Sequence, residues 1–117
     1  MSREKKVLFR RLKKHKEYKR VYKKGRSLGG RDIVLFVMDN HLGFNRFGFT
    51  VSKKVGKAVV RNRVRRLFKE ACRLNISEFP TGRDYVLLAR ANVVGQSYGA
   101  VEKSLLRLVK KLRPPKG

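Results

Sequence analysis

Three stretches of the chain place apolar residues three or four positions apart, which is the spacing of one helix face. The predicted helices cover residues 13–24, 58–74 and 98–112. Gly25 stands where a glycine cap would end the first helix, and two prolines follow the last one. The middle helix has an apolar arc of about a third of its surface, which we expect to pack on a sheet. The arc consists of Val60, Val64, Leu67, Phe68, Ala71 and Leu74.

Three shorter segments, residues 33–38, 47–52 and 84–90, have the composition of strands and are bounded by turn-forming residues. The first is apolar on both faces. The second alternates apolar side chains with small or polar ones, so one of its faces can admit a ligand close to the backbone. Residues 40–45 contain Gly43 and two asparagines, which predicts a hairpin turn that pairs the first two strands. The order α-β-β-α-β-α predicts a small α+β or α/β sandwich with helices covering a sheet.

The length of 117 residues and the hydrophobic content of 41% predict one domain, 1–117, with a true core. We expect residues 1–9 and 113–117 to be flexible tails. No stretch approaches the ~20 apolar residues of a spanning helix, and residues 1–14 lack the apolar core of a secretory signal. The single cysteine, Cys72, cannot form an internal disulfide, and its position on the middle helix predicts a buried or half-buried side chain. These features predict a cytoplasmic protein.

The net charge of the chain adds a prediction about its binding partner. Lys and Arg number 32 against 8 Asp and Glu, which gives a formal net charge of +24. A charge of this size repels itself unless a polyanion neutralises it, so nucleic acid is the expected partner and a membrane surface the alternative. Nine of the cations lie within residues 52–74, where Glu70 is the only acid. A solvated helix face is the plainer interpretation of that segment, but such a face normally mixes both signs.

The middle helix also carries the triplet Arg61-Asn62-Arg63. A guanidinium group can bind phosphate through two parallel hydrogen bonds and can stack on a base. The amide of Asn62 adds a donor and an acceptor for a base edge or a sugar hydroxyl. The triplet therefore predicts a surface that binds a nucleic-acid backbone.

Aromatic residues predict a second surface. Tyr18 and Tyr22 lie one turn apart on the first helix, and Phe36 lies on the first strand. If that helix crosses the sheet near Thr50, the rings line a groove in which bases of a single strand can stack, at roughly 1–3 kcal/mol each. The alternative is that the three rings are simply core residues.

Catalytic side chains are sparse in this chain. The eight acids are scattered singly and lack the spacing of a two-metal nuclease, and His15 and His41 lie in no catalytic motif. The chain has no phosphate-binding loop and no zinc-site spacing. We therefore expect no catalytic residue and no metal ligand among its side chains.

The segment VSKKVGKAVVRNRVRRLFKEACR, residues 51–73, closely resembles the signature of the bacterial ribonuclease P protein family. A weaker resemblance extends through LKKHKEYKRVYKKG, RDIVLFVMD and PTGRDYVLLAR. It implies the protein subunit of a ribonucleoprotein endonuclease that removes the 5′ leader from precursor tRNA. In that family an RNA subunit carries out the cleavage with Mg²⁺ bound mainly by RNA, and the protein binds both this RNA and the leader. A structural RNA-binding protein of the ribosomal type is the main alternative, and a metal-dependent nuclease acting alone is the second.

The resemblance also implies roles for individual residues. The implied contacts to the RNA subunit are Lys53, Lys54, Arg61, Asn62, Arg63, Arg66 and Arg73. The implied leader groove consists of Tyr18, Tyr22, Val34, Phe36, Thr50, Ser52, Arg65 and Lys69. Family members often have phenylalanine at the two tyrosine positions, and arginine is common at position 69. The implied fold is a compact α+β sandwich of the ribosomal protein S5 domain 2-like type, with an uncommon left-handed βαβ crossover.

Overall fold

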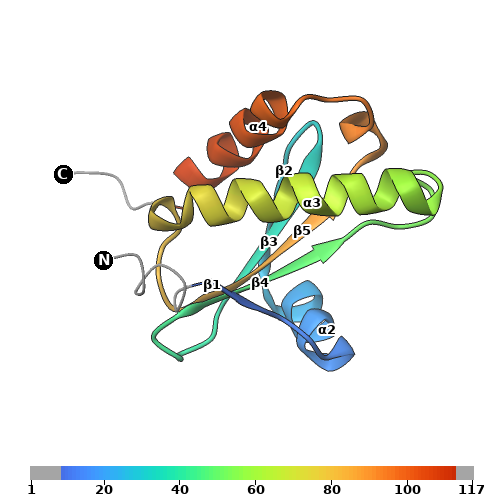
Figure 1. Cartoon of the computed structure of the whole chain (residues 1–117). Helices are drawn as coiled ribbons and strands as arrows, with labels where there is room; N and C mark the ends of the chain where they lie inside the picture. Colours follow the sequence, from blue (N-terminus) through green and yellow to red (C-terminus); the bar gives the residue numbers. More distant parts are fainter. Residues whose placement is uncertain (1–8, 113–117) are drawn as a thin grey trace.

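In the computed structural model, which describes residues 9–112, a five-stranded sheet has helices on both faces (Figure 1). The helices and main strands lie where the pattern predicts them, with small shifts at their ends. In chain order the elements are β1 (Phe9–Arg11), α2 (His15–Lys24), β2 (Arg26–Gly29), β3 (Ile33–Asp39), β4 (Asn45–Thr50), α3 (Ala58–Leu74), η1 (Ile76–Glu78), β5 (Arg83–Ala89), η2 (Ala91–Val93) and α4 (Tyr98–Lys110). Of the predicted tails, residues 1–8 and 113–117 lie outside the described part of the chain.

Two short edge strands were not predicted from the sequence. β1 pairs in parallel with β4, and the ring of Phe9 stacks on Phe47 with centroids 5.3 Å apart. Phe9 is therefore part of the sheet, and the expectation that it belongs to a flexible tail is wrong. β2 pairs with β3 in antiparallel fashion at the other edge. Both strands are short and largely polar, as edge strands commonly are, so no apolar alternation marks them.

The predicted hairpin between β3 and β4 is wrong. The strand order is β1-β4-β5-β3-β2, so β5 lies between the two strands and pairs with both of them. Residues 40–45 do turn the chain, but they pass the start of β5, where Asn40 N donates to Gly82 O at 2.9 Å. The apolar alternation of a strand determines which face each side chain occupies. It does not determine which strand lies beside it.

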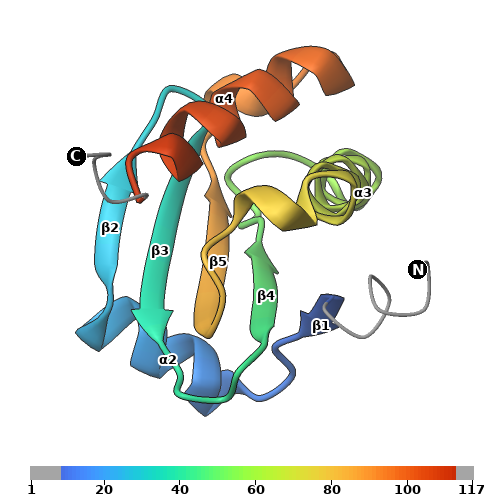
Figure 2. The same ribbon diagram turned by 90° about the vertical axis from the view of Figure 1, so that its left-hand side faces the viewer.

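β4, α3 and β5 form a left-handed crossover, as the family resemblance implies. The two strands are parallel neighbours, and α3 connects them on the face that also carries α4. Both strands run from left to right in Figure 1. In Figure 2, which looks along them from the left, β4 lies to the right of β5 and α3 lies above, so the path turns anticlockwise as it advances. Parallel βαβ units are almost always right-handed.

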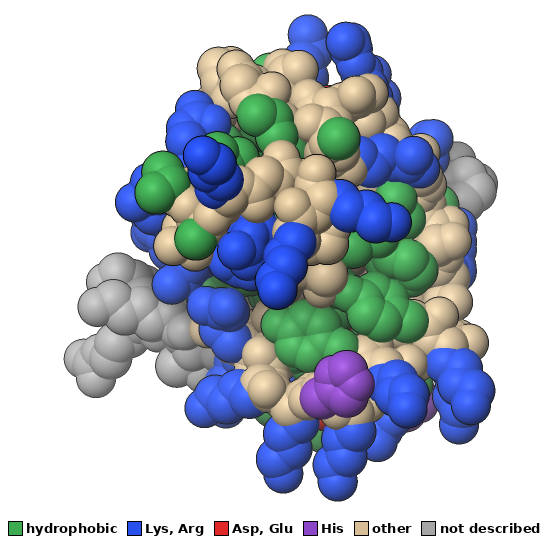
Figure 3. Space-filling model, turned by 90° about the vertical axis from the view of Figure 1, so that its right-hand side faces the viewer, with side chains coloured by type: hydrophobic (Ala, Val, Ile, Leu, Met, Phe, Trp, Pro, Cys, Tyr) green, Lys and Arg blue, Asp and Glu red, His purple; other side chains and the backbone are tan. Residues whose placement is uncertain are grey.

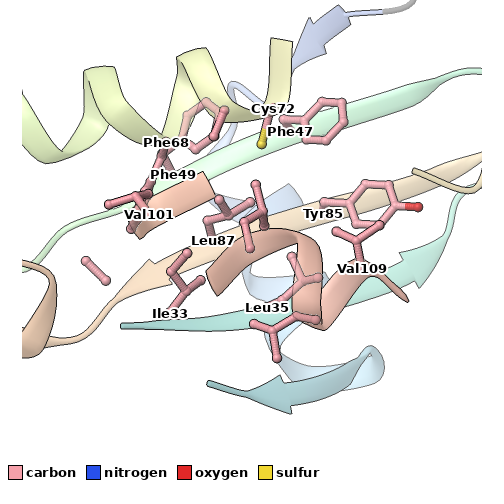
Figure 4. Packing of buried hydrophobic residues seen from close by; sticks show 14 of the residues in the cluster. Ile33, Leu35, Phe47, Phe49, Phe68, Cys72, Tyr85, Leu87, Val101 and Val109 are labelled. Atoms are coloured by element: carbon pink, nitrogen blue, oxygen red, sulfur yellow. The ribbon is translucent and has the colours of Figure 1, made fainter. Parts of the chain in front are cut away.

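The main core lies between the sheet and the helices α3 and α4 (Figure 4). From α3 it takes Val64, Phe68, Ala71 and Cys72, all of which are buried. The prediction of a buried or half-buried Cys72 is therefore confirmed. Burial raises the pKa of its thiol well above the ordinary range, which leaves it protonated and unreactive. Leu74 is 55% exposed, so its predicted place in the buried arc is wrong: it occupies the last position of α3, where the helix leaves the sheet.

Gly25 ends α2 as predicted, but not through a left-handed backbone conformation. Its φ angle is −81°, and its N–H donates to Val21 O at 2.9 Å. A Cβ at this position would lie 2.6 Å from Val21 O and 2.7 Å from Val37 O. Glycine is needed here because the end of α2 passes directly against the backbone of β3.

Candidate nucleic-acid interface

A charged network fixes the first turn of α2 against the sheet. Glu17 Oε1 accepts hydrogen bonds from the N–H groups of Lys14 at 2.9 Å and Lys13 at 3.0 Å, which caps the start of the helix. Its Oε2 binds Arg46 Nη1 at 2.9 Å, and Arg46 in turn binds Asp84 on β5. The backbone bonds from Lys14 and Lys13 are the main reason that the pKa of Glu17 lies below its ordinary value. α2 is thereby anchored through β4 to β5.

The following turn brings the aromatic side chains of α2 onto the sheet. Tyr22 meets Phe36 of β3 edge to face, with ring centroids 4.9 Å apart and planes at 80°. Its hydroxyl shares a hydrogen bond of 2.5 Å with Thr50 Oγ1 of β4. Tyr18 lies over Gly48 of β4, where an added Cβ would be 2.5 Å from the ring atom Cε2. The structure therefore confirms that the predicted rings gather beside Thr50.

Both interpretations of these aromatic residues are partly correct. Val21 and Val86 are buried beneath α2, and Tyr18 and Phe36 pack half-buried against them. Tyr22 remains 37% exposed. Because Val86 belongs to β5, the central strand forms the floor between β3 and β4. The rings thus form a small second core and also leave a partly exposed aromatic surface.

The aromatic surface borders the end of β4, where Thr50 is the last residue of the strand. Val34 is half-buried two residues before Phe36, on the same face of β3. Ser52, Lys53 and Lys54 follow β4 in the turn that leads to α3, and all three are exposed. The polar and basic residues predicted for this region therefore follow directly after the strand that carries Thr50.

Arg61 and Arg65 lie on the side of α3 that faces the end of β4. Arg61 Nε donates to Gly56 O at 3.1 Å, in the turn before the helix. Arg65 Nη2 donates to Val51 O at 3.4 Å, while its Nη1 donates to Asn62 Oδ1 at 3.0 Å. Both arginines are half-buried. They border the core and are held by backbone carbonyl groups.

Arg63 leaves α3 on the other side. Its Nη2 donates to Gln96 O, 3.4 Å away in the loop before α4. Arg73, at the far end of α3, pairs with Glu70 at 2.8 Å. Within residues 9–112, the side chains of Arg66 and Lys69 have no hydrogen-bonding or ion-pair partner, and both are exposed. The cations predicted to contact the RNA subunit therefore do not share one face: they surround the outer half of α3.

Lys and Arg side chains surround exposed apolar side chains at the end of the molecule where α2 begins and α3 begins (Figure 3). In Figure 3 basic side chains dominate the charged surface of this face. The acids nearest α2 are already paired, because Glu17 and Asp84 both bind Arg46. This combination of uncompensated positive charge and aromatic surface is typical of proteins that bind single-stranded nucleic acid.

A basic cavity at the start of α2 was not predicted. It has a volume of about 440 Å³ and is lined by Arg10, Arg11, Lys13, Lys14, Glu17, Phe44 and Arg46. The guanidinium carbon of Arg10 lies 4.6 Å from the centroid of the Phe44 ring, and that of Arg11 lies 5.0 Å from the Phe49 ring. The run of cations from position 10 to 16 was the available signal. This signal does not predict the cavity, because β1, which positions Arg10 and Arg11, has no apolar alternation.

Over the described residues, no three His, Cys, Asp or Glu side chains gather where they could hold a metal ion. In the same part of the chain, no helix is both long and apolar enough to cross a membrane.

The sequence matches a family model described as Ribonuclease P over residues 8–113. It is 49% identical over 100 residues to the ribonuclease P protein component of Pelotomaculum thermopropionicum, which covers 86% of this chain and 89% of that protein. It is 45% identical over 102 residues to the same component of Alkaliphilus metalliredigens, with coverage of 87% and 92%.

Solved structures of RNase P proteins are also similar to this chain. The RNase P protein of Thermotoga maritima superposes with a TM-score of 0.82 at 29% identity, covering 89% of this chain and 98% of that one. The RNase P protein of Staphylococcus aureus has a TM-score of 0.81 at 31% identity, with coverage of 88% and 94%. Because the family match spans nearly all of the described fold and the relatives are aligned over most of their own lengths, the chain belongs to the ribonuclease P protein family.

Proposed function

We propose that this chain is the protein subunit of a ribonuclease P holoenzyme, in which it binds the catalytic RNA subunit and the 5′ leader of precursor tRNA. Family membership supports the tRNA-processing role. The observation that carries the leader-binding part is the contact of Tyr22 with Phe36 and Thr50, which builds an exposed aromatic edge beside polar groups.

A leader is a single strand, so its bases are free to stack and its phosphates are accessible. The Tyr22 and Phe36 rings supply stacking surface, and Thr50 supplies a hydroxyl group. Arg65 reaches the end of β4 and can bind a phosphate of a strand that leaves the groove there. Each stacked base contributes roughly 1–3 kcal/mol.

The outer half of α3 faces the RNA subunit in this proposal. Arg63 and Arg66 lie on exposed parts of that surface, and Lys53 and Lys54 lie beside its first turn. The cleavage chemistry and its Mg²⁺ belong to the RNA subunit. The protein neutralises phosphates and holds the leader in one position, and positioning of this kind can raise a rate without supplying a catalytic side chain.

The test is reconstitution of the protein with a ribonuclease P RNA, followed by measurement of leader release and substrate affinity. Tyr22→Ala removes the exposed ring, whereas Tyr22→Phe keeps the ring and removes only the bond to Thr50. We expect Tyr22→Ala to weaken binding of precursor tRNA by about 1–3 kcal/mol and to leave binding of mature tRNA unchanged. Tyr22→Phe is expected to stay close to the wild-type affinity.

Two results would contradict this proposal in different ways. Equal losses for precursor and mature tRNA would show that the groove does not contact the leader. Failure of the wild-type protein to stimulate leader release at low Mg²⁺, together with recovery of ribosomal RNA in a pulldown, would favour a structural RNA-binding protein instead.

A further inference from the structure

A shallow depression lies between α3 and the start of α4. These two helices cover the sheet face opposite α2 (Figure 2). Its volume is about 510 Å³. Its lining is formed by Arg66, Leu67, Lys69, Glu70, Arg73 and Tyr98. The depression combines an aromatic ring and a leucine with three cations and one acid, which is the composition of a surface that receives a base and its phosphates.

The ring of Tyr98 is held in place from both sides. Its hydroxyl donates to Glu102 Oε2 at 2.9 Å, and the same oxygen accepts a bond from Asn75 Nδ2 at 2.8 Å. Asn75 Nδ2 also donates to Ala71 O at 2.8 Å, which ties α4 to the end of α3. The ring itself packs half-buried against the main core. It is therefore ordered before any ligand arrives, which lowers the entropic cost of binding.

Tyr98 also stays neutral under physiological conditions. Burial, reinforced by the hydrogen bond to Glu102, raises the pKa of Tyr98 to about 12. The phenol therefore remains a hydrogen-bond donor to Glu102, and the network that orients the ring persists across the neutral range.

The cations around the ring differ in whether an acid neutralises them. Glu70 pairs with Arg73 at 2.8 Å, whereas Arg66 and Lys69 have no hydrogen-bonding partner within residues 9–112. Lys69, which the family resemblance implies for the leader groove, lines this depression together with Arg66 and Arg73. The excess of positive charge favours an anionic occupant over an apolar segment of a protein.

We propose that Tyr98 is a stacking platform for an unpaired base of the RNA subunit, and that Arg66 binds a phosphate next to that base. The inference rests on the proposed function and extends it to α4. The RNA subunit is the occupant because the depression adjoins the outer surface of α3, on the opposite sheet face from Tyr18 and Tyr22 of α2, which are proposed to bind the leader. Sequence-specific RNA recognition commonly uses unpaired bases stacked on aromatic rings.

The experiment measures assembly of the protein with a ribonuclease P RNA in the absence of substrate, over a series of salt concentrations. Tyr98→Leu keeps an apolar side chain against the core but removes the aromatic ring, and Tyr98→Phe keeps the ring but removes the bond to Glu102. We expect Tyr98→Leu to raise the Kd for assembly about ten-fold with an unchanged salt slope. We expect Tyr98→Phe to change the Kd by no more than about three-fold. Arg66→Ala should reduce the salt slope by roughly one unit.

Denaturation of the free proteins shows whether each variant folds as the wild type does, and Tyr98→Phe supplies a folded comparison if Tyr98→Leu is destabilised. Assembly of Tyr98→Leu with wild-type affinity, or a loss in Tyr98→Phe as large as in Tyr98→Leu, would overturn the stacking proposal. So would unchanged assembly combined with weaker precursor tRNA binding by the assembled holoenzyme, because the ring would then contact the substrate. Failure of the wild-type chain to assemble at all would instead remove the proposed function.

Discussion

Arg46 on β4 and Asp84 on β5 are joined by two parallel hydrogen bonds, Nε to Oδ1 and Nη2 to Oδ2, each 2.8 Å long. The third nitrogen of Arg46 binds Glu17 of α2 at 2.9 Å. Asp84 is only 2% exposed and also accepts a bond from Asn40 Nδ2 at 2.8 Å. A single guanidinium group therefore connects two parallel strands to the helix that carries Tyr18 and Tyr22.

Replacing Arg46 with methionine is expected to destabilise the fold by about 3 kcal/mol, because it leaves the buried Asp84 carboxylate without its cation. Urea denaturation of the free protein measures the loss. Adding Asp84→Asn to Arg46→Met removes the unpaired charge and keeps an acceptor for Asn40. The double variant should therefore regain part of the stability. A single variant that unfolds at the wild-type urea concentration would contradict the structural role of this pair.

Glu17 should make the stability depend on pH. Its pKa is lower in the folded protein than in the unfolded chain, so its ionised form stabilises the fold above an unfolded pKa of about 4.3. That contribution is lost as the pH falls through the lower, folded pKa. We expect Glu17→Gln to be less stable than the wild type by about 0.5–1 kcal/mol at pH 7.

The difference in unfolding free energy between wild type and Glu17→Gln should shrink once the pH drops below about 4.3. Taking the difference removes the effect of the other carboxyl groups, which are common to both proteins. A difference that stays constant from neutral to strongly acidic pH would show that the Glu17 charge does not support α2.

Gly48→Ala should displace Tyr18, because the new Cβ would lie 2.5 Å from ring atom Cε2 and 2.7 Å from Cζ. We expect a stability loss of about 1–3 kcal/mol from overpacking. Affinity of the holoenzyme for precursor tRNA should fall as well. Combining Gly48→Ala with Tyr18→Ala removes the clash, so the double variant should be more stable than expected from the sum of the two single losses. Additive losses would mean that the ring and the strand do not meet in this way.

Arg61 and Arg63 leave α3 on opposite sides, one toward Gly56 O and the other toward Gln96 O. If both contact the RNA subunit, Arg61→Ala and Arg63→Ala should each lower the salt slope of assembly by roughly one unit, and the double variant by roughly two. Lysine replacements keep the charge and should retain the slope. If the alanine variants all keep the wild-type slope, the two arginines face away from the RNA. The same salt titrations also measure the Kd for assembly with the RNA subunit.

The pattern of apolar residues was sufficient to predict the three helices and the three longer strands. The alternation in β4 correctly separated its buried face, which includes Phe47 and Phe49, from the face that carries Thr50. Spacing on α2 predicted that Tyr18 and Tyr22 share a face. These predictions succeed because they depend on local periodicity, which the chain carries wherever one face of an element is buried.

The sequence by itself therefore determined the charge, the main elements and their buried faces, and its signature segment indicated the family. Tertiary structure alone placed β5 between β3 and β4, and it directed the side chains of Arg61 and Arg63 to Gly56 O and Gln96 O and brought Tyr98 beside Arg66. Strand neighbours depend on pairings between segments far apart in the chain, and the direction of a long basic side chain depends on the carbonyl groups that its surroundings offer. Neither leaves a periodic trace in the sequence, because both are set by contacts between elements rather than within them.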